Sequence, residues 1–365
     1  MCTNPLKAFK YGKTENGKDN YIIRKYDVDH LEILDDGRII NVYSAPIMAS
    51  KRTIREFIEI PCNSCLQCRL DYSKRWADRC MLEAMYHDEN AFITLTYDDK
   101  NVPLVDGVDP VTGELKKFKT LRKKHFQDFM KRFRNIVNEI PKEKRKFYNG
   151  RKYYRKGDDK FKEIRYMASG EYGSQTNRSH YHAIIFGWYP SDDDIVLLGK
   201  NELGQDYYGS ATLAKAWPYG FHVIGKADWN SCAYVARYVV KKMFPFEKNF
   251  YEACNIEPEF ILMSRRPGIG AQWYEDHKEE YYNFSKTYLK TQNGSHSIGS
   301  VKYFDRKVAK ECPELYEDMI KNRVWFAKHR KALEKKQTNL KYIDYLSVKN
   351  ENLERKTKAL KVNKL

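Results

Sequence analysis

The residues best suited to chemistry in this 365-residue chain are two histidines and two tyrosines. His180 and His182 lie two positions apart in a run of apolar and β-branched residues typical of a strand. Because alternate residues of a strand share a face, both imidazoles can reach one metal ion while Tyr181 faces the other way. The pair therefore predicts a metal site.

The two tyrosines, Tyr234 and Tyr238, are four residues apart in a helix-compatible stretch. This spacing places both phenols on one helical face, with Lys241 and Lys242 about a turn further on. A metal site combined with two candidate nucleophiles suggests metal-assisted phosphoryl transfer to tyrosine.

Two histidines alone hold a divalent ion poorly, so the metal site needs a third ligand. Glu171 precedes His180 by nine residues, and the strands expected at 164–169 and 180–186 are joined by a polar, glycine-containing segment. A hairpin would place the Glu171 carboxylate beside the imidazoles. Two imidazoles and one carboxylate suit Mg²⁺ or Mn²⁺ acting as a Lewis acid.

A non-haem oxygenase of the cupin type is an alternative use of such a site, with His222 as a further ligand. That class wants an acid soon after the second histidine, and residues 183–187 contain none. The oxygenase interpretation would also leave the paired tyrosines without a role.

A second metal-binding pattern involves Cys62, Cys65 and Cys68, with Cys80 further on. Two intervening residues suit thiolate ligands, so the group fits a Zn²⁺ site, but three cysteines at the head of a helix also fit reduced thiols. An iron–sulfur cluster is less favoured. The chain shows no signal peptide and no run of ~20 apolar residues, which predicts a reducing, cytosolic protein in which the eight cysteines are thiols or ligands.

The composition favours a nucleic-acid partner. The net charge is +17 and the sequence pI is near 9.2, while 28 tyrosines offer flat surfaces for base stacking. A solvated basic surface with an ordinary aromatic core is the alternative. Residues 321–365 hold fourteen Lys and Arg against four Asp and Glu, in a largely helix-forming basic tail.

The expected elements alternate between strands and helices. We expect a small β element at 20–60, a basic amphipathic helix at 67–87 and a helix at 120–137, opposite strands at 91–97, 164–169, 180–186 and 220–225. A Gly- and Pro-containing loop is expected around 106–110, a hairpin or mobile basic loop at 141–162, and a helix that opens at Asp228. This order predicts an α+β fold: an antiparallel sheet with helices packed against one face.

Three motifs give the chain a resemblance to the rolling-circle replication initiators of microviruses, single-stranded DNA phages, within the HUH endonuclease superfamily. They are the strand 92–97, His180-Tyr181-His182 and the two-tyrosine segment 234–242. The gokushovirus-like branch shows similar segments at 61–68 and 264–270, and the resemblance covers about residues 60–270. Tyr181 stands where the family commonly has a bulky aliphatic residue, and an aromatic should still pack there.

The resemblance implies a ferredoxin- or RRM-like core at 89–270, between an N-terminal part at 1–88 with the β element, the cysteines and the basic helix, and a basic helical region at 271–365. It implies a metal bound by Glu171, His180 and His182, and a tyrosine that nicks the origin strand. The products are a 5′-phosphotyrosine and a free 3′-OH, and the second tyrosine later allows strand rejoining. Lys241 and Lys242 would favour the phenolate.

The same resemblance implies partners. These are single-stranded origin DNA, touched by Arg265 and Arg266, and a host polymerase and single-strand-binding protein in the host bacterial cytoplasm. No ATP-binding loop of the Gly-x4-Gly-Lys-Ser/Thr kind is present in the sequence, so a host helicase would unwind the duplex. A non-catalytic DNA-binding or packaging protein, and an HUH transposase or relaxase, remain the alternatives.

Overall fold

The computed structural model describes residues 2–17, 19–44, 50–139, 164–173, 177–200, 206–241, 245–284, 287–291 and 294–362. The chain forms two compact units. The smaller unit comprises Met1–Asp71 and His329–Leu365, and the larger unit comprises Tyr72–Lys328. The domain boundaries expected at residues 88 and 270 do not coincide with the limits of these units, and that division stays a prediction.

The smaller unit contains the β element expected at 20–60. One sheet has the order β2-β1-β6 and the other has the order β4-β3-β5. Phe9, Val28, Leu31 and Ile54 form their shared apolar core. The strands are β1 (Leu6–Lys13), β2 (Asp19–Lys25), β3 (His30–Leu34), β4 (Ile39–Val42), β5 (Ser50–Ile54) and β6 (Phe57–Ile60).

The basic C-terminal region is helical, as its composition predicts. Helix α8 (Pro313–Lys336) is followed by α9 (Tyr342–Val362). Within the smaller unit, Thr3 Oγ1 donates to Asn350 Oδ1 at 2.8 Å, and Lys331 Nζ lies 4.4 Å from the centre of the Tyr342 ring. The end of the chain therefore packs with its beginning.

A seven-stranded antiparallel sheet dominates the larger unit, with the order β12-β13-β14-β7-β11-β10-β15. This confirms the predicted α+β class and its antiparallel sheet. The strands are β7 (Asn90–Tyr97), β10 (Arg165–Tyr172), β11 (Ser179–Phe186), β12 (Ile195–Lys200), β13 (Asp206–Ser210), β14 (Gly220–Lys226) and β15 (Phe260–Met263).

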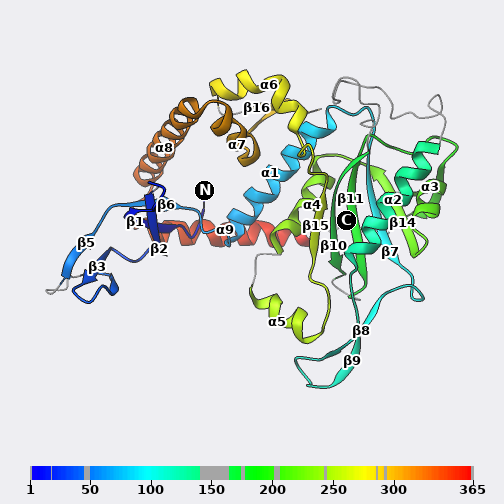
Figure 1. Ribbon diagram of the computed structural model, residues 1–365, viewed down its shortest axis with the longest axis horizontal. Helices are drawn as coiled ribbons and strands as arrows, with labels where there is room; N and C mark the ends of the chain where they lie inside the picture. Colours follow the sequence, from blue (N-terminus) through cyan, green and yellow to red (C-terminus); the bar gives the residue numbers. More distant parts are fainter. Residues whose placement is uncertain are drawn as a thin grey trace. The chain divides into compact units, whose positions relative to one another are not determined.

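Helices cover both faces of this sheet, so the expectation that they pack against one face is wrong. Figure 1 shows α2 (Lys123–Glu139) and α3 (Ala211–Ala216) on one side, and α1 (Leu66–Ala84) and α4 (Trp229–Lys241) on the other. The central strands are apolar at nearly every position: Ile93 and Ile185 face α2, whereas Ile184 and Phe186 lie in the cluster with α1 and α4. A strand buried on both faces must be covered twice.

Some local expectations needed correction. The segment around Asp106-Gly and Asp109-Pro is a β-hairpin of β8 (Leu104–Val108) and β9 (Leu115–Lys119), because a tight turn at 109–113 pairs the flanking residues. Strands β12 and β13 and helix α3 were not expected. The basic segment 141–162 lies outside the described residues.

The start of α4 is confirmed. Ser231 N–H donates to Asp228 Oδ1 at 2.7 Å, and Asp228 N–H donates to Ser231 Oγ at 2.8 Å. This reciprocal pair satisfies backbone donors that a helix start leaves open, which fixes where the tyrosine-bearing helix begins.

A third apolar cluster lies at the C-terminal end of the larger unit, around Trp273, Tyr281 and Phe304. No helix in the described part of the chain is both long and apolar enough to span a membrane. The remaining elements are α5 (Pro245–Ala253), α6 (Ala271–Phe284), β16 (Thr287–Thr291), β17 (Gly294–Ile298) and α7 (Lys302–Glu311).

Candidate active site

The three predicted metal ligands meet on the central hairpin of the sheet. Strands β10 and β11 pair antiparallel with Glu171 directly opposite His180. Glu171 Oε1 lies 3.0 Å from His180 Nε2 and 2.6 Å from His182 Nε2. Since the ligand atoms of all three residues lie within 4.8 Å of one another, they can bind a single ion.

The second nitrogen of each imidazole contacts another protein group. His180 Nδ1 lies 3.0 Å from the Arg178 carbonyl oxygen, to which it donates, and His182 Nδ1 lies 2.8 Å from Thr94 Oγ1. The ring of Phe92 stacks on His182, with centroids 5.6 Å apart and an interplanar angle of 7°. These contacts aim both Nε2 atoms at the carboxylate, as the outer partners of metal-binding histidines do.

Thr94 and Phe92 are site residues that the sequence analysis missed. Both lie on β7, whose residue Thr94 pairs with His182 and whose residue Phe92 pairs with Ile184. The strand itself was predicted, and its alternation places Phe92 and Thr94 on one face. Only the pairing of β7 with β11 shows that this is the histidine face.

Burial and hydrogen bonding oppose each other in the electrostatics of this site. Burial alone would raise the pKa of the Glu171 carboxyl group, but hydrogen bonds from His180 and His182 outweigh it and lower the pKa to about 2. Burial lowers the pKa of His182. For His180, the contact with Glu171 overcomes burial and raises the pKa. An ionised carboxylate beside a neutral His182 is the form that binds a cation.

The chemistry of the donor set fits the divalent ion that the family resemblance implies. Two nitrogens and one carboxylate oxygen, with no sulfur, suit Mg²⁺ or Mn²⁺. The side chain of His180 is more exposed than those of Glu171 and His182, which leaves access to the site from that side.

Tyr234 lies against the same site. Its hydroxyl oxygen is 3.5 Å from His182 Nε2, and the two rings meet edge to face with centroids 4.9 Å apart. The Arg237 guanidinium lies 5.5 Å from the centre of the Tyr234 ring. Helix α4 therefore presents one candidate nucleophile beside the predicted metal ligands.

The other members of the two-tyrosine motif are described only in part. Tyr238 and Lys241 belong to α4, four and seven residues after Tyr234, so the helical spacing predicted for the tyrosines is confirmed for the backbone. The side chains of Tyr238 and Lys241, and all of Lys242, lie outside the described residues. Their roles stay predictions.

Tyr181 faces away from the metal ligands, as predicted, and is completely buried. Its hydroxyl donates to the Arg122 carbonyl oxygen at 2.9 Å and accepts from Arg122 N–H at 3.0 Å. The Tyr97 hydroxyl lies 2.7 Å away, with His125 Nδ1 2.8 Å beyond it. Because a hydroxyl has one proton, Tyr97 must donate to Tyr181 and His125 to Tyr97.

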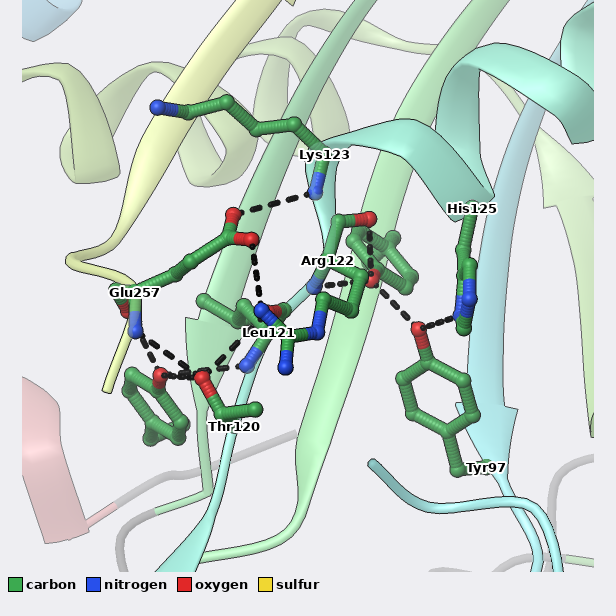
Figure 2. Close-up of polar contacts among 9 residues, drawn as sticks. Tyr97, Thr120, Leu121, Arg122, Lys123, His125 and Glu257 are labelled. Atoms are coloured by element: carbon green, nitrogen blue, oxygen red, sulfur yellow. Dashed lines mark hydrogen bonds and ion pairs between the residues drawn. The ribbon is translucent and has the colours of Figure 1, made fainter. Parts of the chain in front are cut away.

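Figure 2 shows this network at the start of α2, where Glu257 also accepts from the Lys123 N–H at 3.2 Å. An aliphatic residue at position 181 would pack but would leave these backbone groups without the tyrosine hydroxyl. The departure from the common family residue thus has a structural role: it links β11 to α2 directly beneath the two histidines.

The two arginines predicted to contact DNA, Arg265 and Arg266, are exposed in the turn that follows β15. A buried ion pair supports this turn. Arg165 pairs with Glu83 and also donates to the Pro267 carbonyl oxygen at 2.7 Å, while Glu83 accepts from Gly270 N–H. The turn is held from below while both guanidinium groups face outward.

Two other predicted ligands lie elsewhere. The Cys80 thiol is buried against Met167 Sδ, 3.3 Å away, and does not join the other cysteines. The reason is helical rise: Cys68 and Cys80 are twelve residues apart on α1, or ~18 Å. His222 on β14 accepts from Ser210 N–H at 3.0 Å and is not in the histidine group, which removes the ligand that the oxygenase alternative needs.

Comparison with known proteins gives one consistent result. A family model described as a replication-associated protein of the ORF2 type matches residues 90–243. The chain is 29% identical to the replication-associated protein ORF2 of Spiroplasma virus 4, covering 100% of this chain and 99% of the relative. It is 30% identical to the replication-associated protein VP4 of Bdellovibrio phage phiMH2K, covering 68% of each, and 27% identical to the replication-associated protein ORF4 of Chlamydia phage 1, covering 70% of this chain and 55% of the relative. No solved structure matches.

Proposed function

Because the chain belongs to the family of replication-associated proteins of microvirus-like phages, we propose that it initiates replication by nicking the viral origin strand with a tyrosine. The observation that carries this proposal is the convergence of Glu171, His180 and His182 beside the Tyr234 hydroxyl. A carboxylate, two imidazoles and a phenol in contact are the parts that a metal-dependent tyrosine nickase requires.

When bound by Glu171, His180 and His182, Mg²⁺ or Mn²⁺ supplies a Lewis acid that withdraws charge from a non-bridging phosphate oxygen. Tyr234 or Tyr238 attacks phosphorus, a phenolic O–P bond forms, and the bond to the 3′ oxygen breaks. The tyrosine loses its proton, and the departing 3′ oxygen gains one and leaves as a free 3′-OH. Lys241 and Lys242 would favour the phenolate by their positive charge.

The second tyrosine supports the full cycle. One tyrosine holds the original 5′ end while the other cuts the regenerated origin, and the released 3′-OH attacks the first phosphotyrosine to close a circle. The energy of the phosphodiester bond is conserved, so no ATP is consumed. The proposal includes host helicase, polymerase and single-strand-binding protein as partners in the bacterial cytoplasm.

A labelled single-stranded origin DNA tests the proposal. The protein is incubated with it and Mn²⁺ or Mg²⁺, and the products are separated under denaturing conditions. We expect a covalent protein–DNA adduct and a shortened strand with a 3′-OH. EDTA, His180→Gln and the double variant Tyr234→Phe/Tyr238→Phe should each abolish the adduct.

The matched control is Tyr207→Phe, which alters a tyrosine of β13 outside the site and should leave the adduct unchanged. Tight binding of origin DNA without any adduct would instead favour the non-catalytic DNA-binding or packaging function. The single variants Tyr234→Phe and Tyr238→Phe, assayed separately for cleavage and for rejoining, show which tyrosine attacks first.

A further inference from the structure

Four cysteine thiols gather in the smaller unit, apart from the residues of the candidate active site. The Sγ atoms of Cys2, Cys62, Cys65 and Cys68 all lie within 4.8 Å of one another. Cys2 Sγ is 3.5 Å from Cys62 Sγ and 3.7 Å from Cys65 Sγ. We propose that these four thiolates bind one Zn²⁺ ion in a structural site, with Cys2 in the place that the sequence suggested for Cys80.

Strand pairing brings the ends of this site together. β1 and β6 are antiparallel neighbours, and Leu6 at the start of β1 lies opposite Ile60 at the end of β6. Cys2 precedes Leu6 by four residues and Cys62 follows Ile60 by two, so both leave the sheet at the same end. A separation of sixty residues along the chain hides this proximity from the sequence.

The loop between β6 and α1 supplies the other ligands. Asn63 adopts a left-handed conformation with φ of 60°, which turns the chain back so that Cys65 N–H donates to Cys62 Sγ at 3.2 Å. Cys65 directly precedes α1, and Cys68 lies in its first turn. Cys62 N–H donates to Cys2 Sγ at 3.4 Å. Backbone N–H groups directed at sulfur stabilise thiolates, which are the form that binds metal.

The spacing of the sulfurs fits one tetrahedral ion. A Zn–S bond of ~2.3 Å places tetrahedral ligands ~3.8 Å apart, close to the 3.5 and 3.7 Å observed. Disulfides do not explain the group, since bonded sulfurs lie ~2.0 Å apart. An iron–sulfur cluster spreads its cysteines over several iron atoms, whereas these four converge on one point.

The site would join three parts of the smaller unit: the residues before β1, the loop after β6 and the start of α1. Metal binding at such a point contributes directly to folding, because the unfolded chain has no preformed site. Its four sulfurs select a soft ion, while the nitrogen and oxygen donors of Glu171, His180 and His182 select a hard one. The two sites can therefore be tested independently.

The test is the zinc content of the purified full chain, tagged at its C-terminus so that Cys2 keeps its natural surroundings. We expect about one tightly held Zn²⁺ per chain. Cys2→Ser and Cys65→Ser should lose it, whereas Cys80→Ala and Cys312→Ser, which alter cysteines outside the group, should retain it. The triple variant Glu171→Gln/His180→Gln/His182→Gln should also retain it.

Wild-type chain reconstituted with Co²⁺ covers the case in which a cysteine variant fails to fold. We expect the thiolate-to-cobalt charge-transfer absorption and the intense visible bands of a tetrahedral sulfur site. Retention of zinc by Cys2→Ser, loss of zinc in the triple variant, or a zinc-free wild-type chain without a cobalt–thiolate spectrum would each overturn the proposal.

Discussion

At the scale of single residues, the candidate site depends on groups that do not touch the metal position themselves. Thr94 is the clearest example, because its hydroxyl contacts His182 Nδ1 at 2.8 Å and so fixes which way the ring points. Arg178 does the same for His180 through its carbonyl oxygen, which no substitution of the side chain removes. Thr94 can therefore be tested by mutation and the Arg178 carbonyl cannot.

We predict that Thr94→Val weakens Mn²⁺ binding about 10- to 100-fold, because valine keeps the shape of threonine and loses only the hydrogen bond to His182. Isothermal titration of Mn²⁺ into the protein measures this effect. The matched control is Thr96→Val, on the same face of β7, which should change the affinity little. Equal losses in both variants would show that the strand, and not this hydroxyl, is responsible.

Tyr181→Phe tests the opposite face of the same strand. Removal of the hydroxyl leaves the buried Arg122 N–H and carbonyl without that partner, so we predict a loss of about 1–3 kcal/mol in the free energy of unfolding. Urea denaturation gives the value. Tyr166→Phe, whose ring also packs on Phe126 but makes none of these backbone contacts, should lose less. A fully stable Tyr181→Phe protein would contradict the role given to this network.

At the scale of elements, the sheet works as a support with two functional sides. β11 places the histidines toward α4 and Tyr181 toward α2, so one strand both forms the site and anchors it. Helix α1 adds a second support, since Glu83 connects it to β10 through Arg165 and to the turn after β15 through Gly270.

We predict that Glu83→Ala destabilises the larger unit by about 3–5 kcal/mol, because it leaves the Arg165 charge buried without its carboxylate. Both side chains are almost completely buried. Thermal unfolding compared with Asp318→Ala provides the control. Asp318 forms an exposed pair with Lys321 on α8, and its loss should cost less than about 1 kcal/mol. Similar values for the two variants would refute the support role of Glu83.

At the scale of the whole molecule, charge decides how the protein meets a polyanion. The net charge is +17, and residues 321–365 contribute +10 of it, mostly on helices α8 and α9. Attraction of this kind does not depend on base sequence and weakens as salt rises. It is separate from the nicking chemistry, and the two can be tested separately.

We predict that the triple variant Lys328→Gln/Arg330→Gln/Lys336→Gln binds single-stranded DNA more weakly at low salt. If these exposed side chains contact phosphates, the slope of log affinity against log salt should become shallower by up to about 2. Fluorescence anisotropy across a salt series gives the slope. The control exchanges Lys and Arg at the same three positions and keeps the charge. An unchanged slope in the glutamine variant would place the DNA elsewhere.

The family, the metal ligands and the tyrosine helix could be inferred from the sequence alone. Alternation in a strand depends only on neighbouring residues, so His180 and His182 were expected on one face and Tyr181 on the other, as the structure has them. The spacing of Tyr234 and Tyr238 follows from helical periodicity in the same way. Such local patterns are determined by the covalent chain and survive any arrangement of the fold.

Tertiary structure decided what lies across from what. Only strand pairing placed Thr94 beside His182 and Cys2 beside Cys62, and only packing showed that helices cover both faces of the sheet. Sequence spacing suggested Cys80 as a ligand, but the rise of a continuous helix carries it away from Cys68. These contacts join residues that are far apart in sequence, and their proximity depends on the path of the whole chain, which no local pattern records.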